Sequence, residues 1–211
     1  MTSIAATHGT PPVQGDGHAV SAYHESLLRS PVFLGMFMFI GSEIMLFGSF
    51  FTVYFFDRVV NHAPHWPPIV NGHQLERPVF VAAINTLILV TSSFTMHWAL
   101  VSAKRGRRLG LVVGLGMTLV MGLTFLGLQM REYHNLGFVP SDGAFPTTFF
   151  ALTGLHGLHV FVGATLLTIA FIRSCRGHYS PDAHLGLEVT GLYWHFVDVV
   201  WIFLYTVVYL L

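Results

Sequence analysis

The stretch that decides the fold is LEVTGLYWHFVDVVWIFLYTVVYLL, residues 187–211. A helix needs about 20 mostly apolar residues to cross the hydrocarbon core of a bilayer, and this stretch is long enough. Four more stretches upstream share its length and apolar character: 31–56, 78–101, 109–130 and 144–172. Lipid offers the backbone no hydrogen-bond partners, so each span must be helical. The sequence therefore predicts an all-α, polytopic membrane protein with five transmembrane helices.

The composition agrees with a membrane protein and excludes other classes. Of 211 residues, 9% are charged and 53% are hydrophobic, and ten basic side chains balance ten acidic ones. A soluble domain averages about 25% charged residues. The balance of charge leaves no basic footprint for a nucleic-acid partner. The single cysteine excludes a disulfide framework.

The chain divides into a polar N-terminal tail, 1–30, and a five-helix transmembrane domain, 31–211. The tail lacks the basic start and short apolar stretch of a secretory signal peptide. Five spans put the two termini on opposite sides of the membrane. The side of the tail and of the second and fourth loops carries most of the basic residues: Arg29, Lys104, Arg105, Arg107, Arg108, Arg173 and Arg176. The positive-inside rule then predicts a cytoplasmic N-terminus and an outer C-terminus.

Glu43 is the acid that lies deepest in the first span. It is about 12 residues, or about 18 Å along the axis, from the start of that helix. A carboxylate near the midplane costs several kcal/mol unless it is protonated or paired. Glu43 should therefore be a neutral acid with a hydrogen-bond partner, and both a structural and a proton-linked role are open.

His156 is the predicted partner of Glu43. The fourth span runs in the opposite direction, and His156 is about 12 residues from its start, so the two side chains reach a similar depth. His159 lies three positions further along on a neighbouring part of the same face. We therefore predict a hydrogen bond between Glu43 and His156, with His159 close by.

The fifth span carries a stripe of aromatic and polar residues. Trp194, Asp198 and Trp201 follow the three-to-four spacing of one helix face. His195 is three residues before Asp198, so the two can pair along the helix. An acid this deep should face another helix or another subunit rather than lipid. Glu188 lies at the start of the helix, where a carboxylate suits the positive end of the dipole.

Small residues predict close helix contacts. Gly106, Gly110 and Gly114 are spaced by four, and Gly35, Gly41 and Gly48 by roughly a heptad. Ordinary helix packing is the expected role of both sets.

Thirteen histidines raise the question of a bound metal. Only His97, His156, His159 and His195 fall within spans, and neither HExxH nor HxxxH occurs. Copper prefers thiolate or thioether ligands at close spacing, and Cys175 stands alone in a loop. One haem between His97 and His195 is the remaining geometric alternative. We expect no catalytic centre, no metal and no cofactor in this chain.

Three segments resemble subunit III of the haem–copper oxidases. They are GMFMFIGSEIMLF (35–47), SDGAFPTTFFALTGLHGLHVFVGATLL (141–167) and YWHFVDVVW (193–201), which continues as IFLYTVVYL. The similarity runs from about residue 31 to the C-terminus and is closest to the shorter, five-helix bacterial form. Glu43 falls on the intramembrane carboxylate of that family. The SEIMLF sequence and the HWPP loop (65–68) are more similar to the cytochrome c oxidase branch than to the quinol oxidase branch.

The resemblance implies a non-catalytic accessory subunit of a respiratory terminal oxidase in the bacterial inner membrane. Such a subunit packs on subunit I, in a complex with subunit II and other subunits, and the haem and copper lie in those partners. It stabilises the complex and supports proton uptake and oxygen access during O2 reduction, with phospholipids bound beside it. The candidate lipid or subunit contacts are Trp66, Arg173, Glu188, Trp194 and Trp201.

Other functions stay open on the sequence. Subunit III-like proteins also belong to quinol oxidases and accompany nitric oxide reductases. A small proton-coupled carrier using Glu43 and Asp198 is a further alternative, although the inverted repeats that many transporters show are not visible here. The third rival is an electron carrier with the single haem considered above.

Overall fold

The computed structural model describes residues 31–61, 69–70, 73–74, 79–180 and 184–211. Five helices within these ranges are long and apolar enough to cross a membrane, as predicted. They are α2 (Pro31–Phe56), α3 (Val79–Lys104), α4 (Arg108–Asn135), α5 (Ala144–Cys175) and α6 (Leu185–Leu204). Three short helical segments adjoin them: η1 (Asp57–Asn61), η2 (Pro140–Asp142) and η3 (Tyr205–Leu210). The predicted tail, 1–30, lies outside the described residues.

The helices differ from the predicted spans mainly at their ends. α4 continues to Asn135, five residues beyond the predicted end, and α5 continues to Cys175. Helical hydrogen bonding persists into the polar interface, whereas the apolar pattern marks only the hydrocarbon core. A two-residue pair, β1 (Ile69–Val70) with antiparallel β2 (His73–Gln74), was not predicted. The intervening sequence Asn-Gly is a strong hairpin signal that could have indicated it.

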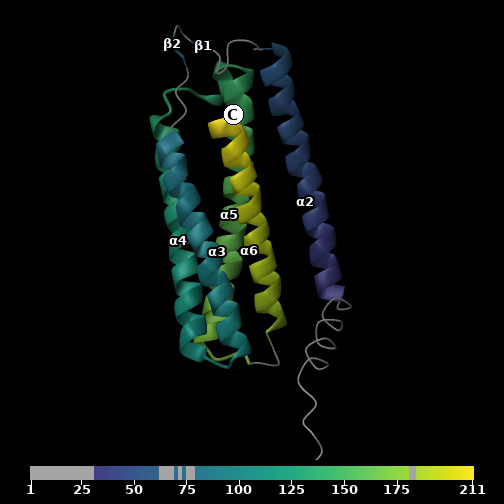
Figure 1. Cartoon of the computed structure of the whole chain (residues 1–211), viewed down its shortest axis with the longest axis vertical. Coiled ribbons are helices and arrows are strands. Elements are labelled where there is room, and N and C mark those ends of the chain that lie inside the picture. Colours follow the sequence, from purple (N-terminus) through teal and green to yellow (C-terminus); the bar gives the residue numbers. More distant parts are fainter. Residues whose placement is uncertain (1–30, 62–68, 71–72, 75–78, 181–183) are drawn as a thin grey trace, which may run out of the picture.

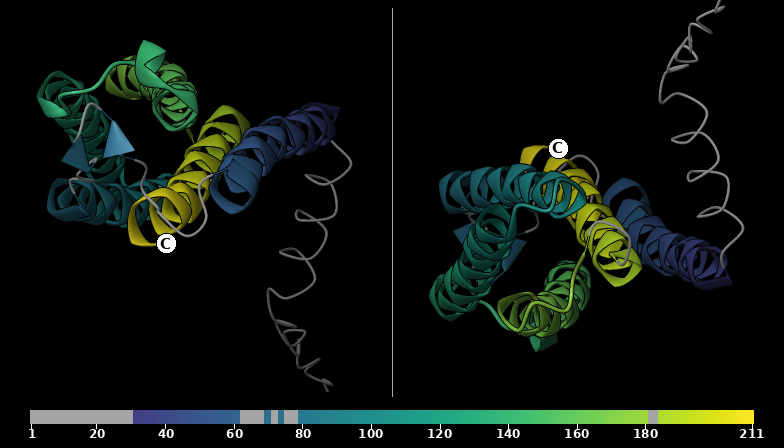
Figure 2. Two further views of the ribbon diagram at one scale, coloured as in Figure 1. Left: turned by 90° about the horizontal axis from the view of Figure 1, so that it is seen from above. Right: turned by 90° about the horizontal axis from the view of Figure 1, so that it is seen from below.

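Four of the helices form a bundle, and the fifth leans on its side. α3, α4, α5 and α6 contact one another in a ring, whereas α2 contacts α5 and α6 (Figures 1 and 2). In the most apolar window of each helix, 6% of the α2 residues are buried inside the chain, against 50% in α6. Most of the α2 surface is therefore left for lipid or for another protein.

Alternating helix directions put the start of α2 and the C-terminus at opposite ends of the molecule (Figure 1). The end where α3 finishes and α4 begins carries the described basic residues of the second and fourth loops: Lys104, Arg105, Arg107, Arg108, Arg173 and Arg176. This clustering is the basis of the predicted cytoplasmic N-terminus.

Glycines allow the close contacts in the bundle. A Cβ on Gly114 would lie 2.8 Å from the Cβ of Ala99, so α3 and α4 touch backbone to backbone there. At Gly122, a Cβ would lie 2.6 Å from the Trp194 ring, and at Gly163 2.9 Å from the same ring. The indole of α6 is thus held between a glycine of α4 and a glycine of α5.

The two predicted glycine sets behave differently. Gly110 and Gly114 pack against α3 as expected, but Gly106 is in the turn before α4 with a positive φ of 67°. The α2 set of Gly35, Gly41 and Gly48 faces open space. Packing within the chain therefore does not explain the α2 glycines.

Replacing Gly122 with alanine should destabilise the protein. The new methyl group would overlap a rigid, buried indole, and overpacking of this kind costs about 1–3 kcal/mol. Gly127→Ala on the same helix is the matched control, because nothing lies within 4 Å of its Cβ position. Thermal unfolding in detergent measures both. Equal midpoints for the two variants would contradict the packing described here.

Candidate functional site

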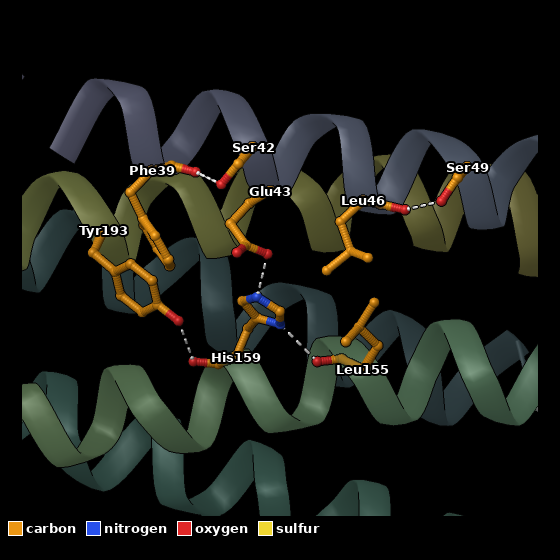
Figure 3. Close-up of polar contacts among 8 residues, drawn as sticks. All are labelled: Phe39, Ser42, Glu43, Leu46, Ser49, Leu155, His159 and Tyr193. Carbon is orange, nitrogen blue, oxygen red and sulfur yellow. Dashed lines mark hydrogen bonds and ion pairs between the residues drawn. The ribbon is translucent and has the colours of Figure 1, made fainter. Parts of the chain in front are cut away.

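The strongest candidate site is a polar pair between α2 and α5. Glu43 Oε2 lies 2.8 Å from His159 Nε2, and the two side chains are 14% and 11% exposed (Figure 3). The other ring nitrogen of His159, Nδ1, lies 2.8 Å from the carbonyl oxygen of Leu155. The Tyr193 hydroxyl donates to the carbonyl oxygen of His159 at 3.1 Å. Glu43 of α2 is thus joined to the bundle by a defined hydrogen-bond network.

The hydrogen-bond pattern shows that Glu43 and His159 share one proton. A carbonyl oxygen can only accept, so His159 Nδ1 must carry a hydrogen and donate to Leu155. The contact between Nε2 and Oε2 then needs one further proton, either on the carboxyl or on the ring. Both arrangements, a neutral acid with a neutral imidazole or a carboxylate with an imidazolium, have zero net charge. The pair can therefore lie at membrane depth without an uncompensated charge.

Aromatic rings cover the pair. The Phe47 ring centroid lies 5.1 Å from that of His159, and Phe39 lies 6.2 Å from Tyr193. Phe47 is itself buried against the bundle. This apolar surround strengthens the hydrogen bond by excluding competing water.

The prediction that His156 is the partner of Glu43 is wrong. His156 is fully buried, and both of its ring nitrogens lack a hydrogen-bond partner among the described residues. Its ring lies against Trp201 at 4.9 Å and Phe125 at 5.8 Å. Depth was estimated correctly, but three residues along a helix turn a side chain by about 60°. That rotation points His159 to α2 and His156 into the bundle.

A second polar group joins α3 to α6. The Ser93 hydroxyl donates to Asp198 Oδ2, and its oxygen lies 3.0 Å from His195 Nδ1. The predicted direct pair of His195 and Asp198 is therefore replaced by a serine bridge from the neighbouring helix. The prediction that Asp198 faces another helix is confirmed, since the residue is only 3% exposed. Ser93 was missed because serine is common in membrane helices and its spacing carries no signal by itself.

The prediction that Trp194 and Trp201 of α6 contact lipid or another subunit is wrong. Trp194 and Trp201 are fully buried, so neither reaches lipid or a partner subunit. Their indole nitrogens donate to α3, from Trp194 to Ser92 at 3.0 Å and from Trp201 to Thr86 at 3.0 Å. The stripe was predicted correctly, but it faces the interior of the bundle.

The remaining predicted contacts have mixed outcomes. Glu188 is in the first turn of α6 as expected, but it is buried and forms an ion pair with Lys104 at 2.7 Å. It is therefore an internal contact rather than one for lipid or a subunit. Arg173 is exposed, with its guanidinium 5.8 Å from the Tyr179 ring. Trp66 lies outside the described residues.

The structure adds a polar contact that the sequence analysis missed. The Tyr209 hydroxyl donates to Glu132 Oε1 at 2.9 Å, and both residues are buried. Glu132 escaped notice because the predicted third span ended at residue 130. In the described part of the chain, no three His, Cys, Asp or Glu side chains gather closely enough to hold a metal ion.

Comparison with known proteins connects this geometry to a family. The family model described as "Cytochrome c oxidase subunit III" matches residues 15–211. The cytochrome c oxidase subunit 3 of the cyanobacterium Thermostichus vulcanus is 41% identical over 206 residues, which cover 96% of this chain and 98% of that protein. The subunit 3 of Loxodonta africana is 38% identical over 190 residues, or 89% of this chain and 72% of that protein.

Two substitutions of Glu43 should show whether the pair needs only a hydrogen bond or also the acidic proton of the carboxyl group. Glu43→Gln can donate its amide hydrogen to His159 Nε2, so the variant should assemble as well as the wild type. Glu43→Leu leaves that nitrogen without a partner, and we expect a loss of about 1–3 kcal/mol. Thermal unfolding and the yield of assembled protein measure the difference. A Gln variant as unstable as the Leu variant would show that the carboxyl proton itself is required.

Removing the carboxyl of Asp198 should loosen the contact between α3 and α6. Asp198→Ala deprives the Ser93 hydroxyl of its acceptor inside the bundle, which costs about 1–3 kcal/mol. Asp198→Asn keeps an acceptor oxygen and is the matched control. Limited proteolysis and thermal unfolding in detergent report on both variants. Indistinguishable behaviour of Ala and Asn would contradict the serine bridge.

Proposed function

The chain belongs to the cytochrome c oxidase subunit III family, and we propose that it is the non-catalytic subunit III of a respiratory haem–copper oxidase of the cytochrome c type. The carrying observation is a match over nearly the full length of both chains to a relative of that name. The five membrane-crossing helices fit a multi-pass membrane protein. The cyanobacterial relative supports a location of this chain in a bacterial inner membrane.

The helix surface supports packing on subunit I. α2 is largely apolar apart from Glu43 and a few hydroxyl groups, yet little of it is buried inside the chain. Its largest outward-facing side chains include Phe37, Met38, Met45 and Phe56. In the proposed complex, subunit I covers one part of this surface and phospholipids cover another, while subunit II and the other subunits complete the assembly. Arg173 is the exposed candidate for a lipid headgroup or subunit contact.

The Glu43 pair supports a role linked to protons. A carboxyl and an imidazole that share one proton at membrane depth can hold it on either group without a change in net charge. This property suits a subunit that assists proton uptake by a neighbouring catalytic subunit. The apolar, phenylalanine-rich surface suits oxygen access, since O2 partitions into apolar surroundings. The haem and copper that reduce O2 belong, in this proposal, to the partner subunits.

Purification of the affinity-tagged full chain in mild detergent tests the proposal. We expect subunits I and II to co-purify, with haem absorbance and cytochrome c oxidation that inhibitors of the haem–copper centre abolish. The chain separated from its partners should show no absorbance in the visible region.

The rival functions give different results in the same experiment. Oxidation of quinol but not cytochrome c by the complex, or co-purification with a nitric oxide-reducing subunit, would move the chain to another branch. Haem bands in the separated chain would favour the electron carrier. Proton-coupled transport by the separated chain in vesicles would favour the carrier.

A further inference from the structure

Seven residues of the helices α3–α6 carry buried polar atoms without a hydrogen-bond partner among the described residues, and four of them lie toward the end of the bundle where α3 and α5 begin. Both amide atoms of Asn85 and Gln129, one carboxyl oxygen of Glu132 and both ring nitrogens of His156 are in this position. None of the four residues is more than 4% exposed. They come from three different helices, α3, α4 and α5.

One of these side chains contacts Trp201 of α6 directly, and the others are linked to it through neighbouring residues. The Trp201 ring lies 4.9 Å from His156 and 6.3 Å from Tyr209, and its indole nitrogen donates to Thr86, the neighbour of Asn85. Tyr209 in turn donates to Glu132. Gln129 is about one helical turn before Glu132 on α4, and its amide lies near the hydroxyl groups of Tyr209 and Tyr133 without reaching the geometry of a hydrogen bond. Trp201 and Tyr209 thus connect His156 to Glu132, and Asn85 adjoins the Thr86 that accepts from Trp201. The other unpartnered atoms of the bundle lie elsewhere, with Ser174 and Glu188 at its opposite end and Asp198 near mid-depth.

Aromatic rings pack beside these residues. Phe125 lies 4.8 Å from Trp201 and Phe149 lies 5.8 Å from Tyr209. Buried polar groups in folded proteins are almost always bonded, either to protein or to ordered water. A buried water needs two to four polar partners, which a set of amides, a carboxyl and an imidazole supplies.

We propose that Asn85, Gln129, Glu132 and His156 line an internal hydration site, in which ordered water molecules bond the groups that lack protein partners. Helix geometry places Glu132 about 4.5 Å from the end of α4, Asn85 and Gln129 about 9 Å from the same end of the bundle, and His156 about 18 Å inward. The polar groups therefore lead from this end of the bundle toward mid-depth. The Glu43 pair is a neighbouring but different set of contacts, because the two side chains point about 60° apart, His159 to α2 and His156 to Trp201.

A density map of the full chain, purified with the proteins that accompany it, tests the site directly. At a resolution that shows ordered water elsewhere in the same map, we expect water density within hydrogen-bond distance of at least two of the four side chains. Direct side-chain bonds among them, or side chains without any neighbouring water density, would overturn the proposal.

Apolar variants provide an independent test. With water bound, Asn85→Leu or Gln129→Leu displaces it and strands the other groups, so the unfolding midpoint should fall by about 2–4 °C or more. Without water, each Leu removes an unsatisfied group, and the midpoint should stay the same or rise, which would overturn the proposal. Thr148→Val is the matched control, because among the described residues this buried hydroxyl bonds only to the carbonyl of Ala144 in its own helix. Its midpoint should shift less than that of either Leu variant.

Discussion

The absence of hydrogen-bond partners in lipid is the constraint on which the rest of the structure depends. It makes all five spans helical, and it also decides where polar side chains can lie. Asp198 and Glu43 both find partners on a neighbouring helix. These two acids thereby become contacts between helices, in a setting where apolar side chains gain little from packing together instead of against lipid.

Two kinds of contact hold the helices together. In the bundle of α3–α6, glycines admit the Trp194 ring and the α3 backbone at close range, and indole nitrogens donate to hydroxyl groups of α3. α2 lacks such close packing and is joined to α5 through the Glu43–His159 pair and the aromatic rings beside it. This difference makes α2 the helix with most surface available to other molecules, which fits the proposed place of the chain beside other subunits.

Several features could be predicted from residue patterns because they depend only on composition along the chain. The number of spans follows from apolar length, and the inward face of Asp198 follows from the cost of exposing an acid to lipid. The depth of Glu43 follows from the rise per residue. The hydrogen-bond partner of Glu43 could not be predicted in the same way. The rise per residue gives only the depth of a side chain, whereas a hydrogen bond also depends on how both helices are rotated about their axes. His159 instead of His156, and Ser93 between His195 and Asp198, are the consequences.

The sequence by itself determined that this protein is a set of five membrane-crossing helices with a few obligatory polar groups, since hydrophobic length and charge are local properties. It also carried the family resemblance in its motifs. Only the tertiary structure decided which polar groups meet, that Trp194 and Trp201 face inward, and that Asn85, Gln129, Glu132 and His156 are buried with atoms that lack a partner among the described residues. The physical reason is that helix rotation and packing depend on contacts between segments far apart in the chain, such as Gly122 with Trp194.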